Sequence, residues 1–208
     1  MAQSDGNDLS RSRRNQRGMT VVELLVVAAI ILITSALAVP LVANAIASFK
    51  LRTAAMDVNT LLQRARLQAV KDNKYHSMQT ATVTIGSNSY TRLYLDRNNN
   101  SSFDAGEPSI QLGKNVTMPT SGAPSGLTSS LGFTVQASSV VPSFNARGTP
   151  CVVRNGICGS WDSSGVEVGF VYYVRSTGTS TNWAAVTVSP SGRFRVWSYD
   201  SHSGVWTN

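Results

Sequence analysis

Hydrophobic residues form one long run near the start of the chain. Residues 24–43 include no charged side chain, and about twenty helical residues reach roughly 30 Å, the thickness of a bilayer's hydrocarbon core. The pattern therefore predicts a helix that can span a membrane. Glu23 lies at the front edge of the run, and a cluster of arginines precedes it, namely Arg11, Arg13, Arg14 and Arg17.

The next segment, 44–73, continues the helical pattern with one apolar face. Apolar residues recur at intervals of three and four, while charged residues take the other faces. We expect the apolar stripe to pack against a sheet. The stripe consists of Ala54, Val58, Leu61, Leu62, Ala65 and Ala69, and the charged residues are Arg52, Asp57, Arg64 and Lys71.

After Asn73 the pattern changes from helical to alternating, which is typical of strands. A Gly-, Pro- and Ser-rich passage at 117–130 predicts an exposed loop, and 86–89 predicts a hairpin turn. The fold class is therefore α+β, a long N-terminal helix packed on an antiparallel sheet domain. The predicted strands are 75–85, 90–95, 131–136, 166–174, 183–188 and 193–199.

The residues around the start of the apolar run carry a specific signal. Gly18, Met19, Thr20 and Glu23 resemble the type III signal of type IV pilins, although the family usually has Phe where this chain has Met19. The resemblance implies cleavage by a prepilin peptidase between Gly18 and Met19, methylation of Met19 and loss of the leader 1–18. Two alternatives stay open: a secretory signal peptide cut after Ala38, and a plain membrane anchor.

The same resemblance implies how the protein assembles. The helix 19–43 would lie in the inner membrane, with the domain 44–208 in the periplasm, and would then pack with other pilins in a pilus or pseudopilus. Glu23 would offset the positive amine of Met19 in a neighbouring subunit, so its charge would be paired. Pro40 stands where pilins carry a helix-kinking proline, and a bend is expected there because proline removes a helical hydrogen bond.

Two later segments are similar to the GspH/FimT branch of minor pilins. Residues 61–71 show the Leu, Ala-Arg, Ala and Lys/Arg pattern of its long helix, and 144–150 show a Phe-Asn-x-x-Gly segment. The resemblance is therefore strongest in the N-terminal third and moderate in the sheet domain.

A second hairpin is predicted near the C-terminus. The loop 190–192 suits a type I turn that ends in a left-handed glycine, which pairs Val188 with Phe194 and Val186 with Val196. Because side chains alternate along a strand, four residues then share the opposite face. They are Arg193, Arg195, Trp197 and Tyr199.

This hairpin also carries a motif. Residues 192–195, Gly-Arg-Phe-Arg, resemble the Gly-Arg-x-Arg motif of FimT-type minor pilins, which is associated with DNA binding during uptake. The resemblance implies that the arginines contact phosphates, and that Trp197 or Tyr199 is available to stack on an exposed base. A strand kept soluble by its arginines is the alternative.

The charge of the chain agrees with an anionic partner without proving one. The chain has 18 Lys and Arg against 11 Asp and Glu. The leader takes away four arginines but only Asp5 and Asp8, so the mature chain stays basic. Such a balance favours polyanions or membrane surfaces. Arg147, Arg154 and Arg175 are further candidates for phosphate contacts.

The two cysteines, Cys151 and Cys158, favour a disulfide. A domain delivered across the membrane lies in an oxidising space, where a bridge that closes this short loop is expected. With no histidine nearby, the pair lacks the ligands of a usual zinc site.

One loop has the spacing of a calcium site. Oxygen-bearing side chains occupy positions 1, 3, 5, 9 and 12 of an EF-hand-like loop. Against calcium, position 6 is Ser101 rather than Gly, and the loop follows a strand, so a polar hairpin turn is the alternative. The five residues are Asp96, Asn98, Asn100, Asp104 and Glu107.

Catalytic motifs are missing from the sequence. His76 and His202 are the two histidines, and neither belongs to an acid–nucleophile pattern, a phosphate loop or a nucleophile elbow. We therefore expect no enzyme and no cofactor other than a possible calcium ion. The predicted function is a minor pilin that contributes DNA binding to uptake. The alternatives are a GspH-type pseudopilin of type II secretion and a secreted calcium-binding module.

Overall fold

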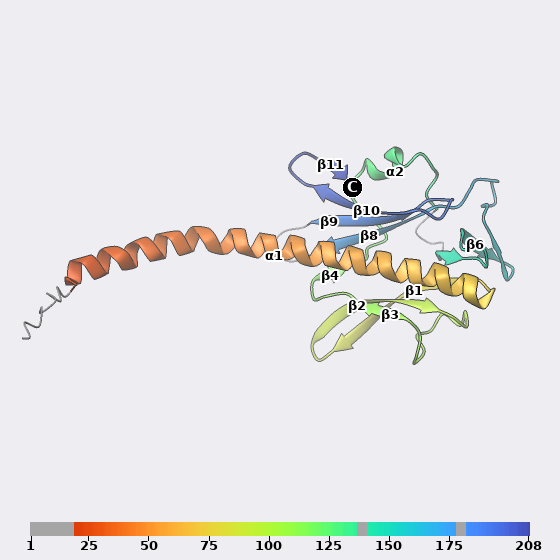
Figure 1. Ribbon diagram of the computed structural model, residues 1–208, viewed down its shortest axis with the longest axis horizontal. Coiled ribbons are helices and arrows are strands. Elements are labelled where there is room, and N and C mark those ends of the chain that lie inside the picture. Colours follow the sequence, from red (N-terminus) through yellow and green to blue (C-terminus); the bar gives the residue numbers. More distant parts are fainter. Residues whose placement is uncertain (1–18, 137–140, 178–181) are drawn as a thin grey trace, which may run out of the picture. The chain divides into compact units, whose positions relative to one another are not determined.

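The structure is a computed structural model that describes residues 19–136, 141–177 and 182–208. The chain divides into two compact units, Met1–Leu41 and Val42–Asn208. One helix, α1 (Val21–Asp72), contributes residues to both units (Figure 1). The predicted leader, with Gly18 at its end, lies outside the described residues.

In the first unit, α1 is apolar and its side chains are exposed. Leu24, Ile30 and Leu32, for example, are each more than half exposed. By length and composition this helix can cross a membrane, as the uncharged run predicts. The helix continues through Pro40.

In the second unit, α1 buries the predicted apolar stripe. All six predicted positions are buried, and Leu51 and Ala55 extend the stripe. The predicted charged positions, from Arg52 to Lys71, are exposed. The spacing of three and four residues therefore identified the buried face correctly, because side chains at that spacing lie above one another on a helix.

Two antiparallel sheets and a short helix complete the second unit (Figure 1). The six-stranded sheet has the order β3 (Ser109–Gln111), β2 (Asn88–Asp96), β1 (His76–Ile85), β5 (Ser143–Phe144), β6 (Pro150–Arg154) and β7 (Ile157–Gly159). The five-stranded sheet has the order β11 (Val205–Thr207), β10 (Phe194–Asp200), β9 (Trp183–Val188), β8 (Phe170–Ser176) and β4 (Val116–Thr117). The short helix is α2 (Leu127–Ser130).

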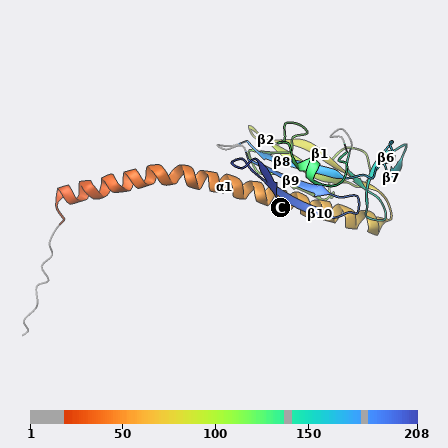
Figure 2. The same ribbon diagram turned by 90° about the horizontal axis from the view of Figure 1, so that it is seen from above.

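One hydrophobic cluster joins α1 to both sheets. Val58 and Leu62 of α1 pack in the same cluster as Leu93 of β2 and Val186 of β9, and all four are fully buried. Figure 2 shows the strands of this unit on one side of the C-terminal half of α1. The α+β fold class is thus confirmed.

A second hydrophobic cluster covers the other face of the five-stranded sheet. It consists of Leu127, Trp183, Ala185, Trp197 and Trp206. Strand β9 is buried along its whole length, since its residues alternate between the two clusters. The second cluster therefore buries the other face of the five-stranded sheet, and it includes Trp197, one of the predicted site residues.

The predictions for the segment between β4 and β5 were partly wrong: residues 118–126 form a loop as expected, but the residues after them do not follow the prediction. The expected loop 117–130 contains α2, whose Leu127 is fully buried. The expected strand 131–136 makes a single bridge, between Val135 and Gly169. Its apolar residues cover the sheet instead of extending it: Leu131 packs on the second cluster, and the Phe133 ring leaves no room for a side chain at Gly169.

The other predicted strands are present with small changes. β9 has the predicted bounds, β1, β2 and β10 differ by a residue or two, and β8 begins at Phe170 rather than at 166. Between β1 and β2, Ile85 pairs with Asn88, so the turn is shorter than 86–89. The sequence did not indicate the short strands β3, β4, β5, β6, β7 and β11.

Candidate functional site

The β9–β10 hairpin folds as its sequence predicts. Val188 pairs with Phe194 and Val186 with Val196. In the loop, the N–H of Gly192 donates to the carbonyl of Ser189 at 2.8 Å. Gly192 has a φ of +77°, a left-handed conformation that favours glycine. The loop is therefore an ordered platform for the residue that follows it.

Arg193 and Arg195 are both exposed, as predicted. The N–H of Arg193 donates to the Ser189 hydroxyl at 3.0 Å, which fixes the backbone where the first arginine leaves the loop. Arg195 lies opposite Thr187 in the ladder. Two guanidinium groups are thus presented to solvent from a rigid hairpin.

Trp197 is not available for stacking, and this part of the prediction was wrong. Its side chain is only 9% exposed, and its indole Nε1–H donates to the Thr187 hydroxyl at 3.0 Å. Tyr199 is half-buried, with its ring centroid 5.2 Å from that of Trp206. The strand alternation was correct, but the second hydrophobic cluster covers the face on which these aromatic residues lie.

The hairpin loop packs against a second glycine turn and against α1. The Arg66 Nη1 of α1 donates to the Gly192 carbonyl at 2.8 Å. A Cβ atom added to Gly192 would lie 3.2 Å from the Gly148 carbonyl oxygen. Gly148 also has a positive φ, and a Cβ there would lie 3.0 Å from Val70. The Gly-Arg motif and the Phe-Asn-x-x-Gly segment therefore meet on α1.

This packing decides which of the additional arginines can join the hairpin. Arg147 is exposed and directly precedes Gly148, so it lies on the turn that touches the loop. Arg175 pairs with Trp183 at the opposite end of the β8–β9 ladder from the loop, and its guanidinium carbon lies 5.5 Å from the Trp183 ring centroid. Arg154 is exposed at the end of β6.

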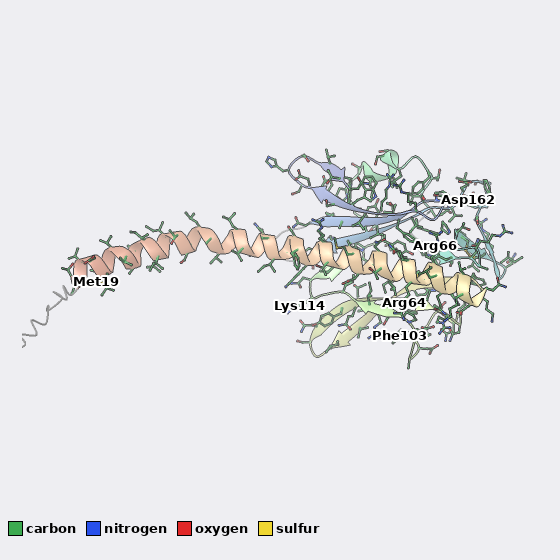
Figure 3. All side chains as sticks on the ribbon, in the orientation of Figure 1. Met19, Arg64, Arg66, Phe103, Lys114 and Asp162 are labelled. Atoms are coloured by element: carbon green, nitrogen blue, oxygen red, sulfur yellow. A yellow bond between two sulfur atoms is a disulfide. The ribbon has the colours of Figure 1, made fainter. Side chains whose placement is uncertain are left out.

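Sequence reasoning missed Arg66 as a member of this site. The helical periodicity indicates that Arg66 lies outside the apolar stripe of α1. Its hydrogen-bond partner, the Gly192 carbonyl, is 126 residues away in the chain, and no local pattern indicates it. Figure 3 shows Arg66 near the C-terminal end of α1, and Asp162 toward the same end of the unit. We use the name arginine cluster for Arg66, Arg147, Arg193 and Arg195.

The predicted disulfide is present. Cys151 of β6 and Cys158 at β7 are bonded, with their Cα atoms 5.3 Å apart. Val153 pairs with Cys158 across the β6–β7 ladder. The bond therefore closes this hairpin at the edge of the six-stranded sheet.

The predicted calcium loop is held by its own hydrogen bonds. The buried Asp96 carboxylate accepts the N–H of Asn100 at 3.2 Å and of Ser101 at 2.8 Å. The side-chain amides of Asn98 and Asn100 donate to Asp104 at 2.7 and 2.8 Å.

The last predicted ligand, Glu107, accepts backbone N–H groups from Arg97 at 2.9 Å and from Asp104 at 3.1 Å. Within the described residues, no group of three or more His, Cys, Asp or Glu side chains is arranged to hold a metal ion. Calcium binding by this loop stays a prediction.

A group of polar side chains forms hydrogen bonds at the C-terminal end of α1. Asp72 accepts hydrogen bonds from Gln68 and Arg97 and contacts the buried His76 at 2.9 Å. These hydrogen bonds, that of Gln68 first and that of His76 next, lower the pKa of Asp72 to about 2. His76 thus has a structural partner. His202 lies in an exposed turn, where its N–H donates to Asp200.

The N-terminal signal residues form a helix cap. The Thr20 hydroxyl accepts the backbone N–H of Glu23 at 3.2 Å, which is the N-cap contact of a Thr-x-x-Glu sequence. Glu23 is exposed in the first turn, where a negative charge is favoured by the helix dipole. Met19 is also exposed.

Comparisons with known proteins support the interpretation of this segment as a pilin-like N-terminus. Residues 13–39 match the prokaryotic N-terminal methylation motif. The chain is 38% identical over 93 residues to the pilin-like protein PilA1 of Thermus thermophilus, an alignment that covers 44% of this chain and 56% of that protein. The chain thus spans about half the length of this relative. No solved structure matches significantly. Together, the motif, this relative and the helix-plus-sheet fold support a type IV pilin-like protein.

Proposed function

We propose that the protein is a minor pilin of the GspH/FimT type, assembled into or at the tip of a type IV pilus, that binds DNA through its arginine cluster. The assembly part of the proposal is supported by the methylation motif and by the exposed apolar segment of α1. Prepilin peptidase would cut before Met19, and the helix would leave the inner membrane as it packs with other pilins. Glu23 would then pair with the new amine of a neighbouring subunit.

The DNA-binding part is carried by a single observation. The Gly192 turn beside Arg193 packs on the Gly148 turn beside Arg147, so two exposed arginines that are far apart in the sequence are carried by turns that touch. Guanidinium groups bind phosphates well because their fork of donors matches the phosphate oxygens. Such contacts position a backbone without reading bases, so we expect weak sequence preference.

The contribution of the cluster to affinity can be estimated. Each neutralised phosphate contributes about −0.9 to the slope of log K against log salt concentration on duplex DNA. Removing Arg193 and Arg195 should therefore reduce the steepness of that slope by about 1.8. Between roughly 50 and 200 mM salt, each pair of phosphate contacts changes affinity by about tenfold. Several subunits along one filament would add to this through multivalency.

The test compares duplex binding by the mature chain in detergent with binding by an Arg193→Ala/Arg195→Ala variant. A matched control, Arg64→Ala/Lys114→Ala, removes the same charge from two exposed residues that Figure 3 shows away from Arg66, toward β2 and β3. We expect the first variant to lose affinity similarly for all sequences and the control to stay near the parent. An equal loss of DNA affinity in both variants would mean that only the net charge of the protein matters. A parent that binds no DNA at low salt would leave the pseudopilin alternative.

A further inference from the structure

One of the four tryptophans differs from the others in its exposure. Three of the four tryptophans are buried, with Trp183, Trp197 and Trp206 at 7%, 9% and 8% exposure, but Trp161 is 57% exposed. An indole normally buries much of its surface on folding, because its apolar area stabilises a core or an interface. Trp161 follows β7 at the edge of the sheet that the disulfide closes, and it supports neither hydrophobic cluster.

Hydrogen bonds link the segment of Trp161 to the turn that carries Arg147. The Asn145 side-chain amide donates to the hydroxyl of Ser160, the residue before Trp161, at 3.2 Å. The Thr149 and Ser160 hydroxyl oxygens are 3.1 Å apart. The other end of the Asn145 side chain accepts the N–H of Arg147 at 2.9 Å. One asparagine therefore sets the positions of both residues.

The two residues also line the same hollow. Arg147 and Trp161 line a surface cavity of about 380 Å³, together with Asn145, Ala146, Cys158 and Ser160. Its wall is braced, since Cys158 is bonded to Cys151. A site whose walls are fixed in the free protein loses little conformational freedom when a ligand enters.

The chain beyond Trp161 is held as well. Trp161 forms a bridge with Glu167, and the Asp162 carboxylate accepts the N–H groups of Ser164 and Val166 at 2.8 and 2.9 Å. The hydrogen bond from Val166, first among several, lowers the pKa of Asp162. Asp162 is therefore a structural residue of the turn.

The hollow and the arginine cluster have Arg147 in common. The Gly148 turn, which directly follows Arg147, packs on the loop that presents Arg193. An aromatic face beside guanidinium groups is the arrangement that binds single-stranded nucleic acid, with bases stacked on the ring and phosphates on the cations.

We infer that Trp161 is a stacking platform for an unpaired base, and that the hollow between Trp161 and Arg147 takes one nucleotide of single-stranded DNA. This inference rests on the proposed function and adds a preference to it. The arginines alone serve duplex DNA, in which the bases are already stacked in pairs, whereas Trp161 contributes only when a base is free. Trp161 thus takes the stacking role that was predicted for Trp197 or Tyr199.

The test uses the mature chain in detergent with an oligothymidine strand and, separately, with a duplex. Trp161→Ala should weaken single-strand binding by roughly 5- to 150-fold, the range that base–aromatic stacking contributes, with duplex binding unchanged. Trp161→Phe should restore most of the loss. Ile157→Ala is the matched control, because Ile157 is 73% exposed on the same edge, and it should bind as the parent does. Thermal unfolding of all variants should coincide.

The possible outcomes distinguish the stacking role of Trp161 from the proposed DNA binding by the arginines. If Arg193→Ala/Arg195→Ala weakens binding to both DNA forms but Trp161→Ala weakens neither, the stacking role is wrong and the DNA-binding proposal stands. Equal loss on single strands and duplex in Trp161→Ala also overturns the stacking role. If the parent binds neither form, both proposals fail together.

Discussion

Replacing Gly192 by alanine tests the packing that brings the arginine cluster together. A residue with a side chain in the left-handed region costs roughly 1–2 kcal/mol. The new Cβ would also lie 3.2 Å from the Gly148 carbonyl oxygen and from the Arg66 guanidinium carbon. Displacing Arg66 breaks its 2.8 Å hydrogen bond to the Gly192 carbonyl, which is worth about 0.5–1.5 kcal/mol. We expect the free energy of unfolding to fall by about 1.5–3.5 kcal/mol.

A glycine with the same backbone conformation and no neighbours gives the control. Gly86 has a φ of +61°, and no heavy atom lies within 4 Å of a Cβ placed there. Gly86→Ala should therefore cost only the roughly 1–2 kcal/mol of backbone strain. The measurement is urea unfolding of the unit 42–208, which contains both hydrophobic clusters. The slope of the free energy of unfolding against urea concentration should be the same in all variants, because the same surface is exposed when each one unfolds.

The comparison of these two variants decides the matter. Gly192→Ala should be less stable than Gly86→Ala, and it should also bind DNA more weakly because Arg193 leaves the turn at an altered angle. If the two variants are equally stable, the contacts of Gly192 with Arg66 and Gly148 contribute nothing, and the arginine cluster is not held as described. Loss of stability without loss of DNA affinity would separate the packing from the proposed function.

Three further predictions concern other parts of the chain. The pKa of Asp72 is lowered in the folded protein from 3.8 to about 2. The ionised carboxylate therefore stabilises the fold fully above pH 3.8, and this stability is lost as the pH falls from 3.8 to about 2. Acid unfolding followed by circular dichroism should show this loss of stability, and the Asp72→Asn variant should lack it. Replacing Cys151 and Cys158 by serine should lower the free energy of unfolding by about 2–5 kcal/mol, and the parent under reductant should match the variant. Two free thiols in protein purified without reductant would contradict the bond. Mass spectrometry of the mature chain should find a methylated Met19, and a Glu23→Ala subunit should be incorporated poorly into filaments; a start at Val39, or normal incorporation, would contradict the proposal.

Local patterns predicted a large part of the fold. The apolar spacing in 44–73 identified the buried face of α1, because helix geometry alone decides which side chains share a face. The loop 190–192 predicted the β9–β10 register for a similar reason, since a three-residue loop ending in a left-handed glycine allows few pairings.

The errors share a different physical cause. Trp197 lies on the predicted face of β10, yet it is buried, because α2 and β11 bring Leu127 and Trp206 onto that face. The segment 131–136 has the composition of a strand, but its apolar residues stabilise the fold by covering the sheet. Whether a strand has one buried face or two depends on what packs on it, and that partner is distant in the sequence.

By itself, the sequence determined the elements that depend on neighbouring residues: the apolar helix, the hairpins with strong turns, and the exposed Arg193 and Arg195. Only the tertiary structure decided which distant residues meet. Arg66 reaches the Gly192 turn across 126 residues, and the Asn145 side chain links the turn of Arg147 to the segment of Trp161. Such contacts depend on the packing of two sheets against one helix, and periodicity along the chain holds no information on them because it reports only which face a side chain takes.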